Sequence, residues 1–231
     1  MNPVILTSIY PKKEDITSAC VNSWRGKYEV YSLNTEEEIK DLKVWYPFVN
    51  FIVATKTAYR LFKKHYVSIE EFYQLGKALG RDVIIINSDI FLTEKIKFRN
   101  TWFRKGIAAG SRWDYKNSIQ RARVLETGFD YFYIPYKYID VLEDMQMYYM
   151  GQCWWDYVVL MRAIKKKISI YHLTDRIAFH WVHEIRYDVV SRKFMANVVM
   201  VNEGIDEFMS VEGHGLNLYC LNKIQSNLIE I

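Results

Sequence analysis

The sequence has few of the features that mark secreted or membrane-bound proteins. Its three cysteines, Cys20, Cys153 and Cys220, are odd in number, lie far apart and form no CxxC pair. This pattern predicts reduced thiols in an intracellular protein and indicates no zinc site. No apolar run approaches about 18 residues, so no transmembrane helix is predicted. The first residues are interrupted too early, at Pro11, to form a signal peptide. We therefore expect a soluble, cytoplasmic protein.

Glycine-rich nucleotide motifs and a strong excess of one charge are also absent. There is no GxGxxG after the first predicted strand and no GxxxxGK[ST] anywhere, which argues against a Rossmann dinucleotide site and a P-loop. The 31 basic and 27 acidic residues leave a net charge of +4, too balanced for a dedicated nucleic-acid binder. Aromatic residues are plentiful, with 18 Tyr, 12 Phe and 7 Trp. Aromatic rings fill a core, but they also stack on sugars and bases.

Strands and helices alternate in the first half of the chain. Apolar strands are predicted at residues 4–9, 29–33, 49–54 and 81–93, and the helices between them begin at caps such as Thr35 and Ser68. Four strands alternating with helices are typical of βαβ units and a parallel sheet. Further strands are predicted near 110–115, 129–134 and 168–173, a helix opens at 151–157, another helix lies around 195–208, and a turn lies at 213–215.

Polar residues follow each of the first four predicted strands. The run at 81–93, RDVIIINSDIFLT, is apolar on both faces, as in a strand covered on both sides, and it contains Asn87-Ser88-Asp89. Thr7-Ser8, Asn34 and Thr55-Lys56 follow the other three strands. In open α/β sheets this edge is where ligands bind, so we expect a nucleotide-sized crevice there. An aspartate after a strand can also be a helix cap or a turn residue, and the triplet alone leaves both open.

Three features suggest chemistry. Asp89 can bind Mg²⁺ or Mn²⁺ that bridges two phosphates, since such ions need only one or two protein carboxylates. His180 and His183 would share a face on a helical turn but not on an extended segment, and each can equally be a structural histidine. Asp156 follows two tryptophans at a helix start. It is either a favourable partner of the helix dipole or, flanked by exposed indoles, a base for a sugar hydroxyl.

Taken in order, the LTSI strand, the IINSDIF strand, the GQCWWDY helix start and the AFHWVHE segment resemble the GT-A glycosyltransferases. The likeness is to small, single-domain, nucleotide-sugar-dependent members from viruses and bacteria, and it covers residues 3–187. It implies an α/β fold with a mainly parallel central sheet sandwiched by helices. It further implies one domain over residues 1–231, with a nucleotide-binding half at 1–93, an acceptor half at 94–187 and a C-terminal extension at 188–231.

The resemblance also implies a set of site residues. The family's DXD-type metal motif falls on Asn87-Ser88-Asp89, where the first acid is asparagine and Asp89 is left as the only carboxylate ligand to Mn²⁺ or Mg²⁺. The family's metal-binding histidine would be His183, with His180 as the second choice. Asp156 would be the catalytic base of an inverting transfer from a nucleotide-sugar, a UDP-sugar as first choice, to a hydroxyl of a glycan or other acceptor. The remaining positions would contact donor or acceptor: Thr7, Ser8, Asn34 and Lys56 for base, ribose and phosphate, Arg112 and Asp114 for sugar hydroxyls or phosphate, and Trp154 and Trp155 for the acceptor.

Two other functions stay open at the level of sequence. A nucleotidyltransferase shares a βαβ nucleotide half and a carboxylate-bound metal, but it usually has a glycine-rich, basic loop after the first strand, and residues 8–13 contain no glycine. A catalytically silent carbohydrate- or nucleotide-binding module would account for the aromatic content and the missing first acid. Both alternatives predict ligand binding without sugar transfer.

Overall fold

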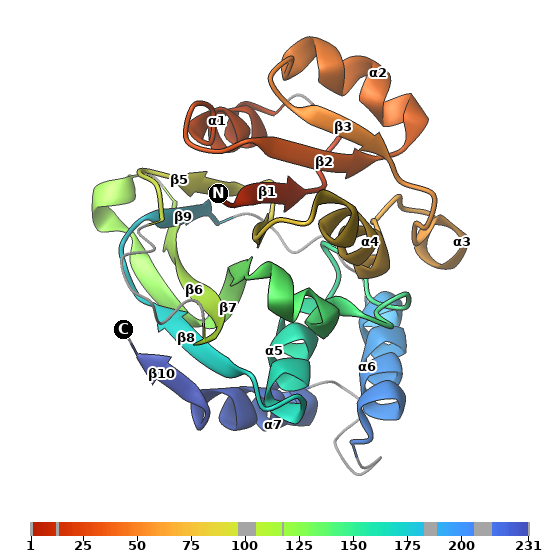
Figure 1. The fold of residues 1–231 in the computed structure, drawn as a ribbon, viewed down its shortest axis with the longest axis vertical. Helices are drawn as coiled ribbons and strands as arrows, with labels where there is room; N and C mark the ends of the chain where they lie inside the picture. Colours follow the sequence, from red (N-terminus) through yellow and green to blue (C-terminus); the bar gives the residue numbers. More distant parts are fainter. Residues whose placement is uncertain are drawn as a thin grey trace.

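A computed structural model of the protein describes residues 2–12, 14–96, 105–116, 118–182, 189–205 and 214–230. It shows a mixed α/β fold built on one curled sheet (Figure 1). The strands are β1 (Val4–Thr7), β2 (Val30–Asn34), β3 (Asn50–Val53), β4 (Val83–Ile86), β5 (Ile90–Leu92), β6 (Gly106–Tyr115), β7 (Arg123–Ile134), β8 (Ser169–Leu173), β9 (Ala178–Trp181) and β10 (Leu228–Glu230). The α-helices are α1 (Asp15–Ser23), α2 (Glu36–Trp45), α3 (Tyr59–Phe62), α4 (Ile69–Leu79), α5 (Trp155–Lys165), α6 (Val189–Glu203) and α7 (His214–Gln225).

The sheet is mixed, which modifies the expectation of a mainly parallel one. Its order is β10-β8-β6-β7-β4-β1-β2-β3, and β7 runs antiparallel to both of its neighbours, β4 and β6. The other neighbours along this order pair in parallel. β7 follows β6 after a short connection, and a short connection joins antiparallel strands, whereas a parallel pair needs a longer crossover.

Local signals in the first half predict the observed elements well. Thr35 caps α2 in a capping box with Glu38, and the Ser68 hydroxyl accepts a hydrogen bond from the backbone N–H of Glu70 at the start of α4. Gly80 ends α4 in the left-handed conformation, with φ of 61°. Each of these residue types satisfies the free backbone groups of a helix end, so the boundaries follow from local chemistry.

The predicted strand at 81–93 divides into two. β4 is fully buried between the layers, and the chain turns at Ser88 and Asp89 before β5. β5 leaves the order of the main sheet and pairs antiparallel with β9, so that Ile90 lies opposite His180. This pairing brings two segments that are about ninety positions apart in the sequence to the end of β4.

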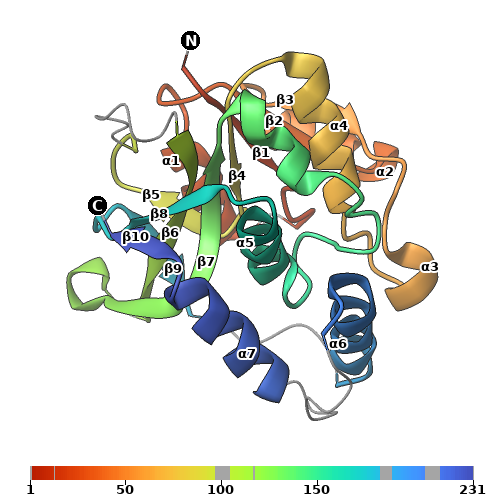
Figure 2. The ribbon, with the colours of Figure 1, turned by 60° about the horizontal axis from the view of Figure 1, so that its bottom comes forward.

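Helices cover both faces of the sheet (Figure 1, Figure 2). On one face Val21 of α1, Trp24 directly after α1 and Leu42 of α2 form a cluster with alternate residues of β1 and β4. On the other face the remaining residues of those strands belong to one hydrophobic cluster with buried residues of α4, α5, α6 and α7. α6 is the helix predicted around 195–208, of which 206–208 are outside the described residues. The predicted turn at 213–215 is wrong at its described residues, because His214 begins α7.

The pairing of β6 with β7 is irregular at two places in the second half of β6, and the extra residues at both places belong to β7. The register with β7 shifts between Gly110 and Ser111 and again between Ser111 and Arg112. Gly110 has no room for a side chain, because an added Cβ would lie 1.7 Å from the buried ring of Tyr131. Bulges of this kind re-aim side chains at the rim of a sheet, and here they bring Asp130 to Arg112. In the described part of the chain, no helix combines the length and the apolar character needed to cross a membrane.

Candidate functional site

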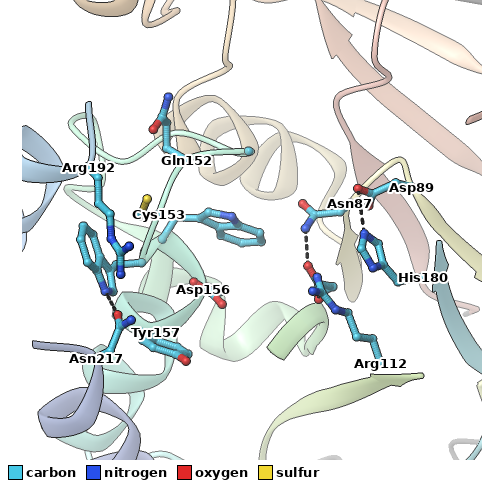
Figure 3. Close-up of a pocket in the computed structure, with 14 residues that line it drawn as sticks. Asn87, Asp89, Arg112, Gln152, Cys153, Asp156, Tyr157, His180, Arg192 and Asn217 are labelled. Atoms are coloured by element: carbon cyan, nitrogen blue, oxygen red, sulfur yellow. Dashed lines mark hydrogen bonds and ion pairs between the residues drawn. The ribbon is translucent and has the colours of Figure 1, made fainter. Parts of the chain in front are cut away.

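A cavity of about 310 Å³ lies between the end of β4 and the start of α5. Figure 3 shows Asn87, Asp89 and His180 on one side of it and Asp156, Arg192 and Asn217 on the other. Its walls therefore come from the turn after β4, from β6, β7 and β9, from the segment that leads into α5 and from the two C-terminal helices. The lining residues are Asn87, Asp89, Arg112, Asp130, Gly151, Gln152, Cys153, Trp154, Trp155, Asp156, Tyr157, His180, Arg192 and Asn217.

Asp130 of β7 organises the first wall. Its carboxylate accepts a 2.6 Å hydrogen bond from Nδ2 of Asn87 and a 2.8 Å hydrogen bond from Nη1 of Arg112. The backbone N–H of Asn87 also donates to the carbonyl of Asp130, at 3.1 Å. Asn87 therefore fixes the turn after β4 to the neighbouring strand.

His180 lies between two carboxylates on the same wall. Its Nδ1 is 3.0 Å from Oδ1 of Asp114, and its Nε2 is 3.5 Å from Oδ2 of Asp89. Burial alone would lower the pKa of His180, but the two carboxylates outweigh burial and raise this pKa to about 9. Asp114 also forms a 2.9 Å ion pair with Nε of Arg112. Burial tends to raise the pKa of Asp114, yet His180 and Arg112 hold it below its usual value. The first wall is thus a chain of alternating acids and cations.

The second wall is the start of α5. Gly151 and Trp154 both have positive φ, 86° and 64°, and Trp154 is a non-glycine residue in the left-handed region at the N-cap of the helix. Such a conformation costs about 1–3 kcal/mol and is found most often at functional turns. The turn places Asp156 in the first turn of α5, where its carboxylate accepts hydrogen bonds from its own backbone N–H and that of Tyr157.

Asp156 is the most strongly perturbed carboxyl group of the site. Burial, and then the negative charge of Asp130, raise its pKa to about 7. It occupies the position of a helix-dipole partner and it also lines the cavity. The two interpretations of Asp156 that the sequence leaves open are therefore compatible.

The two tryptophans before Asp156 line the cavity but are not exposed, contrary to the expectation of exposed indoles. Trp154 and Trp155 retain only 4% and 3% of their accessible surface. Trp155 packs edge-on against Phe132, at 5.4 Å between ring centroids, and Trp154 donates a hydrogen bond from Nε1 to Asn217. Core and interhelix contacts cover the rings, so any contact with a ligand is made by the edges that face the cavity.

Six of the predicted contact residues do not line the cavity: Thr7, Ser8, Asn34, Lys56, Ser88 and Asp114. The Thr7 hydroxyl donates to the carbonyl of Ile86 at 2.7 Å, and Asn34 Nδ2 donates to the carbonyl of Ile9 at 2.9 Å. Both side chains are buried and join neighbouring segments. Ser8 and Lys56 also follow their strands without lining the cavity. Ser88 accepts a 3.3 Å hydrogen bond from the backbone N–H of Tyr10, so the turn after β4 contacts the segment after β1. Contacts of these residues with a nucleotide stay predictions.

His183, the first choice for the metal-binding histidine, lies outside the described residues. His180, the second choice, is buried in a strand and faces the site. Among the described residues, no group of three or more His, Cys, Asp and Glu is arranged to hold a metal ion. A cation bound mainly by a diphosphate and water needs fewer ligands, however, and Asp89 faces the cavity with about a third of its side chain exposed. The site therefore fits a cation held by one carboxylate together with a phosphorylated ligand.

The sequence did not predict several of the residues that line the cavity. Asp130 had a weak signal, as a lone acid between Phe129 and Tyr131 in an otherwise buried strand. Arg192 and Asn217 had none, because they belong to the segment for which no function was predicted. Only the packing of α6 and α7 against α5 places them at the cavity.

No family model matches the chain, and no curated protein matches it. Among solved structures, the CTP:phosphocholine cytidylyltransferase LicC from Streptococcus pneumoniae is similar, with a TM-score of 0.44, 12% identity, and coverage of 85% of this chain and 98% of that one. The glycosyltransferase GlyE from Streptococcus pneumoniae TIGR4 has a TM-score of 0.38 and 13% identity; the match covers 99% of this chain but only 44% of GlyE. Mouse xyloside xylosyltransferase 1 has a TM-score of 0.35 and 13% identity, over 76% of this chain and 79% of that one. These structural neighbours are nucleotidyl- and glycosyltransferases, and at scores this low no statement about activity follows from the likeness.

Proposed function

We propose that the protein is a GT-A-type glycosyltransferase that moves a sugar from a nucleotide-sugar to a hydroxyl acceptor, with inversion. One observation carries the proposal: a single cavity holds an acid-and-cation wall at the end of β4 and, facing it, a carboxyl group whose pKa is raised to about 7. The first wall suits a diphosphate leaving group. The second supplies a base for the attacking hydroxyl.

The donor would lie against the first wall. Mn²⁺ or Mg²⁺ held by Asp89, by diphosphate oxygens and by water would neutralise the charge that develops on the leaving nucleoside diphosphate. Arg112 is fixed through Nη1 to Asp130 and through Nε to Asp114, so its guanidinium is positioned before a ligand arrives. A guanidinium held in this way suits a sugar hydroxyl or a phosphate oxygen of the donor.

The acceptor would lie against the second wall. The acceptor oxygen attacks the anomeric carbon, its proton passes to the carboxylate of Asp156, and the bond from that carbon to the diphosphate oxygen breaks. A base acts best when its pKa lies near the working pH, and the pKa of about 7 meets this condition. A single displacement by the acceptor oxygen, with Asp156 taking only its proton, inverts the configuration of the sugar.

The first experiment identifies the donor. A thermal-shift panel of UDP-, GDP-, CMP- and dTDP-sugars, with and without Mn²⁺, should show one nucleotide that raises the unfolding temperature, because a ligand of the native state stabilises it. Slow hydrolysis of that donor without acceptor would support the transferase. Binding without turnover would instead indicate a silent module, and release of pyrophosphate from a nucleoside triphosphate a nucleotidyltransferase.

The second experiment tests the residues. Asp156→Asn should lower the transfer rate by roughly 10²- to 10⁴-fold while donor binding is kept, because the variant lacks a base. In the wild type the rate should rise with pH through about 7, as Asp156 loses its proton.

Asp89→Ala should abolish the effect of Mn²⁺ on donor binding. The matched control is Asp41→Asn, an exposed position on α2. Full activity in Asp156→Asn would disprove the assignment of the base.

A further inference from the structure

The C-terminal helices form part of the wall beside Asp156. Arg192 of α6 and Asn217 of α7 both line the cavity. Each contacts Trp154 at the start of α5: the Trp154 indole N–H donates to Oδ1 of Asn217, and the Arg192 guanidinium carbon lies 5.8 Å from the centroid of the Trp154 ring. A cation over an indole ring is attracted by it, so the Trp154 ring helps to hold the Arg192 guanidinium in place.

Arg192 carries a positive charge beside the cavity. Within the described residues, no carboxylate lies within ion-pair distance of its guanidinium, whereas Arg112 contacts both Asp114 and Asp130. Asn217 adds donors of the same kind. Its Oδ1 accepts from Trp154, so its Nδ2 hydrogens are turned outward from that bond, and no described group accepts them. Two sets of N–H donors and one positive charge thus meet on one side of the cavity.

We propose that Arg192, assisted by the amide of Asn217, binds an anionic group of the acceptor, a carboxylate or a phosphate. This inference rests on the proposed function and names the acceptor's chemical class. A guanidinium presents paired donors that match the oxygens of either anion. The anion belongs to the acceptor because Arg192 lies on the side of Asp156, across the cavity from Asp89 and Arg112 (Figure 3). The donor diphosphate is the other source of negative charge, and the experiment separates the two.

The test measures binding to the full chain at constant ionic strength by titration calorimetry. The probes are methyl β-D-glucuronide, glucose 6-phosphate, the neutral methyl β-D-glucoside and UDP with Mn²⁺. We expect the wild type to bind the glucuronide or the sugar phosphate at least tenfold more tightly than the glucoside, and the preferred probe tells a carboxylate from a phosphate. Arg192→Ala should lose this preference and keep its affinity for UDP. Lys193→Ala, an exposed neighbour on the same helix, should behave as the wild type.

A second variant tests the same inference if Arg192→Ala does not fold. Asn217→Asp keeps an acceptor for the Trp154 indole but adds a negative charge, so it should also lose the preference for anionic probes. Three results would overturn the inference: no preference for an anion in the wild type, an equal preference in Arg192→Ala, or a loss of UDP affinity in Arg192→Ala, which would assign Arg192 to the donor. An Arg192-dependent preference without any nucleotide-sugar binding would instead refute the proposed function and leave the anion site standing.

Discussion

Asp130 and Asp156 line the same cavity, and their surroundings explain why only one of them is suited to act as a base. Asp130 receives Nδ2 of Asn87 and Nη1 of Arg112, so its charge is matched by a cation and by donors. Burial, followed by the charge of Asp130, raises the pKa of Asp156, and the backbone N–H groups at the start of α5 and the charge of Arg112 offset this rise only in part. The residue type is the same, and the partners decide its chemistry.

The raised pKa of Asp156 predicts a stability effect that is independent of activity. The folded-state pKa of about 7 exceeds the ordinary value of 3.8 in the unfolded chain, so between about pH 4 and pH 7 unfolding releases a proton. The contribution of Asp156 to the free energy of unfolding therefore falls as the pH rises through that range. The fall is roughly 3 kcal/mol when screening by water in the cavity is taken into account. Below pH 4 the contribution is fully present.

Comparing Asp156→Asn with the wild type isolates the effect, because other titrating groups cancel. In urea unfolding followed from pH 4 to pH 8, the variant should match the wild type at the acid end. At pH 8 it should be more stable. Equal stabilities across the whole range would show that the pKa of Asp156 is not raised.

At the scale of elements, a buried ion cluster attaches α6 to α5. The side chain of Glu203, at the end of α6, is only 2% exposed and pairs with Arg162 at 3.1 Å and Lys165 at 2.8 Å, both on α5. The hydroxyl of Tyr148 donates to the same carboxylate at 3.2 Å. The cluster joins the helix that carries Arg192 to the helix that carries Asp156, so it sets the distance between the two sides of the proposed acceptor site.

We expect Glu203→Ala to destabilise the protein by roughly 3 kcal/mol, because it leaves two cations next to a buried cavity without their acid. It should also weaken the preference for anionic probes, since the ion pairs that help to fix α6 on α5 are lost. The control is Glu143→Ala, which removes a half-exposed contact with Lys166 at 4.0 Å and should change the stability by less than about 1 kcal/mol. Similar losses in both variants would contradict a special role for the buried cluster.

At the scale of the whole molecule, the C-terminal helices share a core with the N-terminal strands. Leu216, Cys220 and Ile224 of α7 are fully buried in the same cluster as Val4 and Val83. β10 extends the sheet by pairing with β8. A segment that completes both the core and the sheet is needed for the folded state as well as for the cavity.

We expect a chain that ends after residue 188 to lose cooperative unfolding, because removal of α6, α7 and β10 exposes one face of α5 and the edge of β8. Each large buried side chain that is lost costs about 1.5–3 kcal/mol, and several such losses exceed the stability of a typical domain. Thermal unfolding followed by circular dichroism, with the full chain as reference, would check this. A cooperative transition at an unchanged temperature would show that the C-terminal segment is dispensable.

Local features of the sequence were enough to predict α1, α2, α4, the strands β1 to β4 and the position of Asp89, but not the short helix α3 or the separate strand β5. The capping residues Thr35 and Ser68, and the apolar run before Asn87, act through contacts with near neighbours, so they can be recognised without a fold. Asp156 was likewise placed at a helix start by its own segment. Strand ends alone were a poor guide to the cavity, since Thr7 and Asn34 use their polar groups inside the fold.

Only the tertiary structure decided which of these residues meet. The pairing of β5 with β9 places His180 beside Asp89, and the antiparallel β7 places Asp130 beside Asn87 and Arg112. The packing of α6 and α7 on α5 adds Arg192 and Asn217. Contacts between distant segments depend on how whole layers bury their apolar faces, and no local pattern of residues specifies that arrangement.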